Sequence, residues 1–131
     1  MLRIYFMRHG ETVWNTERRY QGMTDIELSA EGLRQADIAA ERFKGIDIDK
    51  IFCSPLKRAA ATAKPIADEK GLDVIYEDAF REICFGEWEG KTVPELTEKY
   101  GAAFAQPAFS ADNAAGVALL AGEREALWHS S

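Results

Sequence analysis

A short apolar run, Leu2–Met7, stops at Arg8-His9-Gly10, and this junction constrains the fold more than any other segment. The length of the run and its β-forming residues predict a core β-strand. In open α/β sheets, ligands bind beyond the carboxyl ends of such strands. Arg8 offers donors that match phosphate oxygens, Gly10 lets the backbone approach a ligand, and a neutral His9 can attack phosphorus. The alternative is a pair of surface residues at a strand end.

Strand and helix signals alternate from this junction to Tyr100. Ser29 is a candidate N-cap of a helix that Gly45 ends, with one apolar face formed by Leu33, Ala36, Ala40 and Phe43. The other expected elements are a strand at Lys50–Cys53, a helix opened by Ser54-Pro55, kinked at Pro65 and ended by Gly71, a strand at Val74–Tyr76, and a helix from the capping box Thr92-Val93-Pro94-Glu95 to Tyr100. This order predicts an α/β fold, a three-layer α/β/α domain with a mostly parallel sheet.

Size and charge narrow the class of protein. The 131 residues fit a single domain, residues 1–131, and the net charge of −6 argues against nucleic acid as the main partner. No stretch is long and apolar enough to span a membrane, and the first apolar run is too short for a signal peptide. Cys53 and Cys84 are expected to be small buried hydrophobes in a reducing compartment. We therefore expect a soluble cytoplasmic protein, and homo-oligomerisation is an open alternative.

The last part of the chain, residues 102–131, has a different composition. From Ala102 to Gly122, nine of 21 residues are alanine and Asp112 is the one charged residue. Val117–Leu120 has the character of a weak strand or a helix turn. We expect an atypical, loosely packed alanine-rich tail.

Two further segments carry chemistry that suits a phosphate site. Lys57 and Arg58 form a basic pair in the expected first turn of a helix, where the helix N-terminus also favours anions; the alternative is a solvated pair. Glu82 lies among apolar residues, which raise the pKa of a carboxyl group and suit a general acid. The alternative for Glu82 is a surface salt bridge with Arg81. The loop that follows is rich in aromatic residues and glycine, and we expect its Trp88 to be part of a packed turn.

Taken together, these segments resemble the histidine phosphatase superfamily, which has the phosphoglycerate-mutase-like fold. The matching motifs, in the order of the family, are Arg8-His9-Gly10-Glu11-Thr12 with Asn15, Gln21-Gly22, Leu28–Gly32, Ser54–Ala59 with Thr62-Ala63, Glu82, and Phe85-Gly86 with Trp88-Glu89-Gly90. All of them lie within the first 100 residues. The short loop after Glu82 is similar to that of the small phosphatase branch, which includes α-ribazole phosphatase-like and broad-specificity enzymes.

The resemblance implies a role for each matching residue. His9 is the expected nucleophile that becomes a phosphohistidine, and Arg8 and Arg58 are the expected phosphate clamp. Glu82 is the expected acid toward the leaving oxygen and then the base toward water. The expected contacts to phosphate or substrate are Asn15, Thr16, Gln21 and Gly22. The two guanidinium groups are expected to lower the pKa of His9 and to stabilise the transferring phosphoryl group, so the scheme needs no metal and no cofactor.

One expected residue has no clear counterpart. The family has a second essential histidine, which follows a central strand beside the first one and precedes a glycine. His129, the other histidine of this chain, has neither feature. We therefore expect a C-terminally shortened or altered member of the family, in which the loss of one phosphate donor lowers the rate by ~10²–10³. A missing central strand also predicts a fold that is marginal or depends on association.

The function predicted from the sequence is a metal-independent phosphatase that hydrolyses a phosphorylated small molecule through a phosphohistidine on His9. Two alternatives remain open: phosphoglycerate mutase activity, and a catalytically weak phosphate-binding module of the same fold. The absence of a clear counterpart to the second essential histidine is the sequence feature that distinguishes the weak binding module from the active enzyme. The sequence does not identify the phosphate ester.

Overall fold

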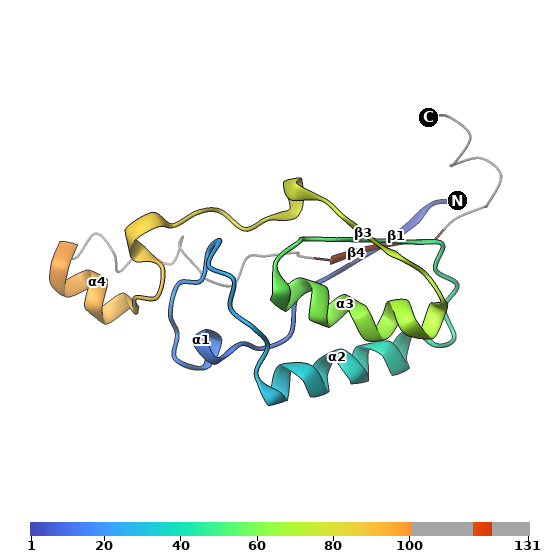
Figure 1. The fold of residues 1–131 in the computed structure, drawn as a ribbon, viewed down its shortest axis with the longest axis horizontal. Coiled ribbons are helices and arrows are strands. Elements are labelled where there is room, and N and C mark those ends of the chain that lie inside the picture. The colour runs from blue at the N-terminus through green and yellow to red at the C-terminus, as the bar shows by residue number, and fades with distance from the viewer. Residues whose placement is uncertain (101–116, 122–131) are drawn as a thin grey trace.

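The computed structural model describes residues 1–100 and the backbone of residues 117–121 (Figure 1). Its elements, in chain order, are β1 (Arg3–Met7), α1 (Val13–Thr16), α2 (Ala30–Phe43), β2 (Lys50–Cys53), α3 (Lys57–Lys70), β3 (Val74–Tyr76), the 3-10 turns η1 (Asp78–Phe80) and η2 (Gly86–Trp88), α4 (Val93–Tyr100) and β4 (Val117–Ala121). The α/β class is confirmed. The short helix α1 was not among the elements expected from the sequence.

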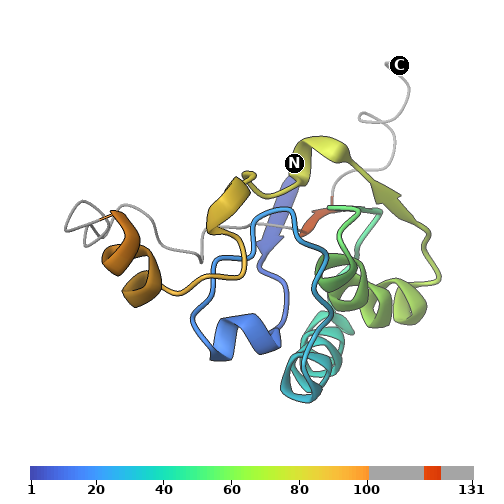
Figure 2. The same ribbon diagram turned by 60° about the vertical axis from the view of Figure 1, so that its left-hand side comes forward.

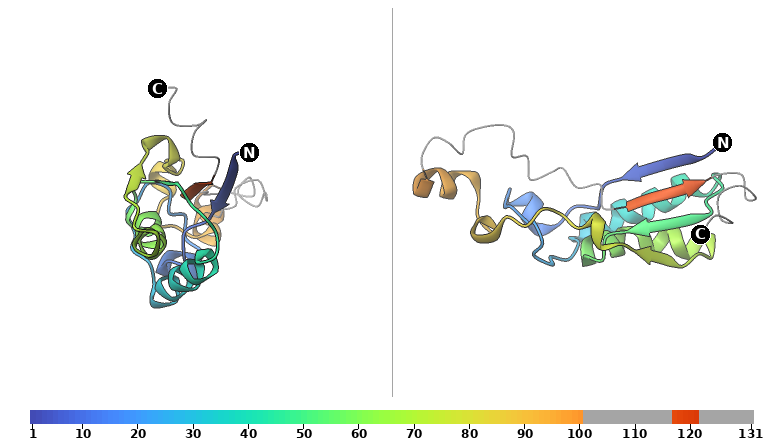
Figure 3. Two further views of the ribbon diagram at one scale, coloured as in Figure 1. Left: turned by 90° about the vertical axis from the view of Figure 1, so that its right-hand side faces the viewer. Right: turned by 90° about the horizontal axis from the view of Figure 1, so that it is seen from above.

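The four described strands form one sheet in the order β1-β4-β2-β3. β2 and β3 pair in parallel, whereas β4 pairs antiparallel with both β1 and β2 (Figure 3, right). Consequently β1, β2 and β3 point the same way, and the prediction of a mostly parallel sheet is confirmed. The weak strand or helix turn expected at Val117–Leu120 is a strand. It lies beside β1 in the interior of the sheet, so the prediction of a missing central strand is wrong for the described sheet. The rest of the alanine-rich tail, residues 102–116 and 122–131, lies outside the described residues.

The main core lies between the sheet and two helices. Figures 1 and 2 show α2 and α3 on the same face of the sheet. Ile51 and Cys53 of β2 are fully buried there, and Ala63 and Ile66 of α3 pack against them. Burial also raises the pKa of the Cys53 thiol to about 12. The described elements thus form two of the three predicted layers.

The prediction that the first strand is a core strand is wrong for the described sheet, where β1 lies at an edge. Successive side chains of a strand point to opposite faces. Tyr5 and Met7 pack toward the core, whereas Ile4 is 45% exposed and Phe6 is 68% exposed on the alternate positions. The strand therefore has one covered face and one face open to solvent among the residues described.

Helix α2 begins as predicted. Ser29 is its N-cap, and the Ser29 hydroxyl accepts a hydrogen bond from the Gly32 N–H at 3.1 Å. Ala36 and Ala40 are buried, but the expected core residue Leu33 is 52% exposed. The reason is that the first turn of α2 contacts Glu11 through the backbone of Gly32, and the side chain of Leu33 stays half-exposed.

Helix α3 differs from prediction at its start and agrees at its end. The helix begins at Lys57 with Leu56 as N-cap, so Ser54-Pro55 precede it. The Ser54 hydroxyl accepts from the Leu56 N–H at 3.3 Å and closes a turn ahead of the helix. The helix continues past Pro65 and ends at Gly71, as predicted, and the φ of 64° makes Gly71 a left-handed C-cap.

A second, smaller core lies beside α4. Tyr20 and Leu96 are buried, and Phe85 and Trp88 pack against them. The ring centroids of Tyr20 and Phe85 are 5.1 Å apart in an edge-to-face arrangement. The predicted packed turn at Trp88 is therefore confirmed. So is the capping box of α4, because Thr92 N–H donates to the Glu95 carboxylate at 2.8 Å.

Two further outcomes concern cysteine and the membrane. Cys84 is exposed, so the expectation that it is buried is wrong; it lies in the connection between η1 and η2 and not in a core element. Among the helices of the described part, none has the length and apolar character needed to cross a bilayer.

Candidate active site

His9 lies just beyond the carboxyl end of β1 and is 9% exposed. Its Nδ1 is 2.6 Å from the carbonyl oxygen of Gly10. A carbonyl oxygen only accepts hydrogen bonds, so Nδ1 carries the proton and the lone pair of the neutral ring resides on Nε2. In this tautomer Nε2, and not Nδ1, is the ring atom with the chemistry of a nucleophile.

A cavity of about 330 Å³ opens beside His9 and is lined by Arg8, His9, Glu11, Asn15 and Gln35. The structure thus brings together three predicted site residues, Arg8, His9 and Asn15. It adds Glu11, which belongs to the first motif, and Gln35, which no sequence signal indicates. The Gln35 side-chain oxygen accepts from the Glu11 N–H at 2.9 Å, and these residues lie 24 positions apart. Arg58 and Glu82 do not line this cavity.

Two contacts fix the His9 segment on the helices below it. The Gly10 N–H donates to the Thr62 hydroxyl at 2.9 Å, and that hydroxyl donates to the Arg58 carbonyl at 2.7 Å, so α3 supports the segment directly. On α2, a Cβ at Gly32 would lie 2.1 Å from the Glu11 carbonyl oxygen, and a Cβ at Gly10 would lie 2.6 Å from the Gly32 oxygen. The backbone of Gly10 and Glu11 therefore crosses the backbone of Gly32 at close contact, and this crossing requires glycine at both position 10 and position 32.

Arg58 is buried, with 2% of its surface exposed, whereas its neighbour Lys57 is exposed. The alternative of a solvated pair is therefore wrong for Arg58. Its guanidinium donates from Nη2 to the Gly22 carbonyl at 2.6 Å and from Nη1 to the Thr24 carbonyl at 2.8 Å. Burial lowers the pKa of Arg58, and nearby carboxylates oppose this shift, namely Glu82, Asp25 and Glu89.

Glu82 is half-buried, and one of its carboxylate oxygens accepts from the Ile83 N–H at 3.0 Å. Its charge acts on Arg58, so the structure brings these two predicted residues near each other. Arg81 forms its ion pair with Asp78 at 2.9 Å, and not with Glu82 as the alternative had it. Glu82 thus belongs to the environment of Arg58.

The predicted substrate contacts Asn15, Thr16 and Gln21 surround Thr12, which caps α1. The Asn15 side-chain oxygen accepts from the Thr12 N–H at 2.9 Å, and the Thr16 hydroxyl donates to the Thr12 carbonyl at 3.4 Å. Gln21 is buried, and its side-chain oxygen accepts from the Thr12 hydroxyl at 2.5 Å. Gln21 therefore stabilises the Thr12 cap of α1 as a buried residue, whereas Asn15 both contacts Thr12 and lines the cavity. Gly22 has a φ of 55° and offers its carbonyl to Arg58.

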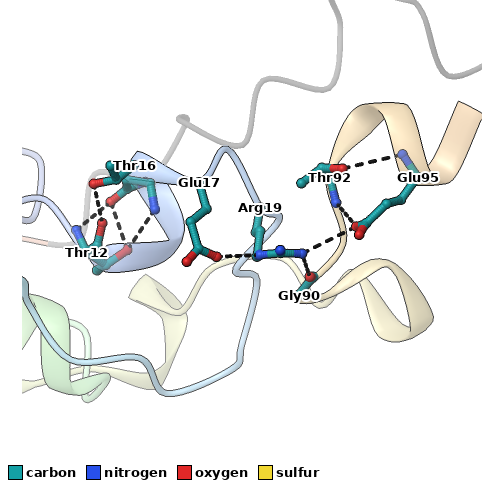
Figure 4. A network of polar contacts seen from close by, with 8 residues as sticks. Thr12, Thr16, Glu17, Arg19, Gly90, Thr92 and Glu95 are labelled. Atoms are coloured by element: carbon teal, nitrogen blue, oxygen red, sulfur yellow. Dashed lines mark hydrogen bonds and ion pairs between the residues drawn. The ribbon is translucent and has the colours of Figure 1, made fainter.

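Arg19 joins this segment to α4, in a network that no sequence motif indicates (Figure 4). Its guanidinium contacts Glu17 at 2.5 Å, the Gly90 carbonyl at 2.8 Å and Glu95 at 3.3 Å. The two carboxylates raise the pKa of Arg19. The loop that ends at Gly90 is thus held beside the segment that follows α1.

Within residues 1–100, no three side chains of histidine, cysteine, aspartate or glutamate are grouped as a metal site would require. His129, the weak candidate for the second histidine, lies outside the described residues.

Comparisons with known proteins place these residues in a family. Residues 4–125 match the family model for the histidine phosphatase superfamily, branch 1. Phosphoserine phosphatase 1 of Hydrogenobacter thermophilus is 44% identical over 100 residues, which are 76% of this chain and 47% of that protein. A probable phosphoglycerate mutase of Enterobacter sp. (strain 638) is 44% identical over 99 residues, 76% of this chain and 46% of that protein.

Solved structures agree with these matches. A mycobacterial glucosyl-3-phosphoglycerate phosphatase superposes with a TM-score of 0.72 at 35% identity, covering 79% of this chain and 50% of that one. A phosphoserine phosphatase of Entamoeba histolytica superposes with a TM-score of 0.65 at 39% identity, covering 83% and 58%. The chain spans about half the length of the curated relatives it matches. From its motifs, its fold and these matches, the chain belongs to the histidine phosphatase superfamily.

Proposed function

We propose that this chain carries the phosphoryl-transfer site of a phosphomonoesterase that works through a phosphohistidine on Nε2 of His9 and needs no metal. The observation that carries the proposal is the hydrogen bond from Nδ1 to the Gly10 carbonyl, which leaves the lone pair of the neutral ring on Nε2 of a residue that lines an open cavity together with Arg8. The names of two relatives, a phosphoserine phosphatase and a glucosyl-3-phosphoglycerate phosphatase, support hydrolysis of a phosphorylated small molecule.

The reaction has two steps in this proposal. His9 Nε2 attacks phosphorus, the bond between phosphorus and the ester oxygen breaks, and Glu82 gives its proton to that oxygen. Water then attacks the phosphohistidine, Glu82 takes a proton from it, and inorganic phosphate leaves with His9 restored. Arg8 stabilises the charge on the phosphoryl oxygens, as a guanidinium does in other phosphoryl transfers.

A catalytically weak phosphate-binding module of the same fold is the second candidate. The observation that favours it is that the described part, residues 1–100 and 117–121, holds one histidine, His9. Mutase activity is a further alternative, favoured by the name of the Enterobacter relative. It differs from hydrolysis in the acceptor of the phosphoryl group, which is a second hydroxyl and not water.

The test is hydrolysis of p-nitrophenyl phosphate by the full chain, with and without a chelator. His9→Ala is the test variant and His129→Ala is the matched control, because the sequence contains these two histidines alone. Turnover that survives chelator and His129→Ala but disappears in His9→Ala supports the phosphatase. Equal, negligible rates in all three proteins support the binding module, and turnover that a chelator removes contradicts the metal-free scheme.

Glu82→Gln tests the assignment of the acid. p-Nitrophenolate leaves without a proton, whereas an alkyl alkoxide needs one. We therefore expect Glu82→Gln to slow phosphohistidine formation from an alkyl phosphate by ~10²–10⁴, and from p-nitrophenyl phosphate much less. Equal losses with both substrates in rapid-quench measurements would remove Glu82 from this role. Transfer to 3-phosphoglycerate in place of water, followed by 31P NMR, would favour the mutase.

A further inference from the structure

Glu89 makes contacts that the proposed reaction does not use. One of its carboxylate oxygens accepts from the Met23 N–H at 2.9 Å and from the Phe85 N–H at 3.1 Å, and the other accepts from the Thr24 hydroxyl. Met23 and Thr24 lie 66 and 65 positions away from Glu89 in the chain. A single carboxylate thus joins the segment after Gln21 to the loop after Glu82.

The same segment is held by Arg58. The carbonyls of Gly22 and Thr24 accept from the two Nη atoms of the buried Arg58 guanidinium, while the N–H of the intervening Met23 donates to Glu89. Residues 22–24 therefore lie between a buried cation and a carboxylate. Both charged groups bind backbone atoms of the segment, so its position depends on both of them.

The fit between Glu89 and this segment is close. Gly22 has a φ of 55°, and a Cβ there would lie 2.2 Å from the Glu89 carboxylate oxygen. Burial by itself raises the pKa of Glu89, but the hydrogen bonds from Thr24, Met23 and Phe85 outweigh it and the pKa of Glu89 is lowered. Glu89 is therefore an ionised acceptor at neutral pH, and hydrogen bonds to charged groups are the stronger class.

We propose that Glu89 is a positioning residue that holds residues 22–24 against Arg58 and thereby fixes the guanidinium for phosphate binding. The link between Glu89 and Arg58 stands on the geometry alone, and the consequence for phosphate rests on the proposed function. Without Glu89, the two carbonyl acceptors of Arg58 belong to a segment that has lost one of its two charged supports. The guanidinium then loses its fixed orientation while its helix, α3, is unchanged.

The experiment compares the full chain with Glu89→Ala and Glu89→Gln. Gln at position 89 keeps an oxygen that can accept from Met23 and Phe85, so it should rescue most of the loss. Glu87→Ala is the matched control, since Glu87 lies in the same loop, is exposed and accepts from the Tyr100 hydroxyl at 3.3 Å. The first measurement is NMR of the Arg58 side-chain N–H signals and of the Met23 amide exchange. The second is calorimetric titration with inorganic phosphate.

We expect Glu89→Ala to speed exchange at Met23, to broaden or shift the Arg58 signals, and to weaken phosphate binding by about 10- to 100-fold. Glu89→Gln and Glu87→Ala should stay close to the wild type in both measurements. Unchanged Arg58 signals in Glu89→Ala, or the same change in Glu87→Ala, would overturn the positioning role. If the wild type binds no phosphate, the proposed function fails, and the NMR arm still decides whether Glu89 positions Arg58.

Discussion

Replacing Gly32 by alanine tests the backbone crossing that holds His9 in place. The new Cβ would lie 2.1 Å from the Glu11 carbonyl oxygen and 3.0 Å from two further Glu11 backbone atoms. Backbone atoms cannot rotate away as a side chain can, so the two segments must separate by roughly 1 Å, a strain of the kind that costs about 1–3 kcal/mol in packed sites. Alanine recovers at most about 1 kcal/mol through its higher helix propensity.

We therefore expect Gly32→Ala to lower the free energy of unfolding by about 1–2 kcal/mol. Glu11 lies two residues from His9, and a displacement of about 1 Å at a reacting group costs about 10²-fold in rate. The phosphatase proposal thus predicts a fall in kcat toward p-nitrophenyl phosphate as well. Urea unfolding followed by circular dichroism measures the first effect, and steady-state kinetics at a temperature where both proteins are folded measures the second.

The matched control is Gly45→Ala, which follows α2 and has no atom within 4 Å of the position of a new Cβ. Surface changes of this kind stay within about 0.5 kcal/mol of the wild type. A Gly32→Ala protein as stable as Gly45→Ala would refute the argument, because it would show that the crossing accommodates a side chain. Lost stability with unchanged kcat would separate the crossing from the placement of His9.

Three other predictions follow from the same contacts. Thr62→Val keeps the shape of the side chain but leaves the buried Gly10 N–H without its acceptor, so urea unfolding should show a loss of about 1–3 kcal/mol that Thr62→Ser largely avoids. Ile51→Ala should cost about 2–5 kcal/mol because Ile51 is fully buried, while Ile4→Ala at the half-exposed edge should cost clearly less; equal losses would mean that the face carrying Ile4 is covered. Folding lowers the pKa of Glu89, so the stability that Glu89 contributes is complete above its unfolded-state pKa of about 4.3 and is lost as pH falls through the folded-state pKa. Urea unfolding measured from about pH 6 to about pH 3 should therefore show a fall in stability in the wild type, and the part of that fall that comes from Glu89 should be absent in Glu89→Gln.

Local signals predicted three of the helix ends, although the predicted start of α3 at Ser54-Pro55 was wrong. The Ser29 cap, the Gly71 cap and the Thr92 box each act on backbone groups within a few residues, and all three were confirmed. Expectations about burial were less accurate. Leu33 and Cys84 are exposed although their residue types favour the core, because burial depends on which element packs over a residue.

In the candidate site too, contacts between residues close in the sequence were predicted and contacts between distant residues were not. The pairing of Arg8 with His9 at a strand end was readable from the sequence, since the two residues are adjacent and the strand signal is local. The environment of Arg58 was not, because the Gly22 and Thr24 carbonyls that cover it lie 36 and 34 positions away. Gln35 lines the cavity and accepts a hydrogen bond from Glu11, which lies 24 positions away, and no sequence motif predicts this contact.

By itself, the sequence determined the alternation of strands and helices, the caps, and the position of His9 just after the first strand. Only the tertiary structure decided that β4 lies antiparallel between β1 and β2, that Gly10 and Gly32 meet backbone to backbone, and that Glu89 and Arg58 hold the same segment. The physical reason is the separation along the chain between the residues that interact. Periodicity and capping report hydrogen bonds and faces within a few residues, whereas strand order and side-chain partners depend on packing between segments far apart in the chain.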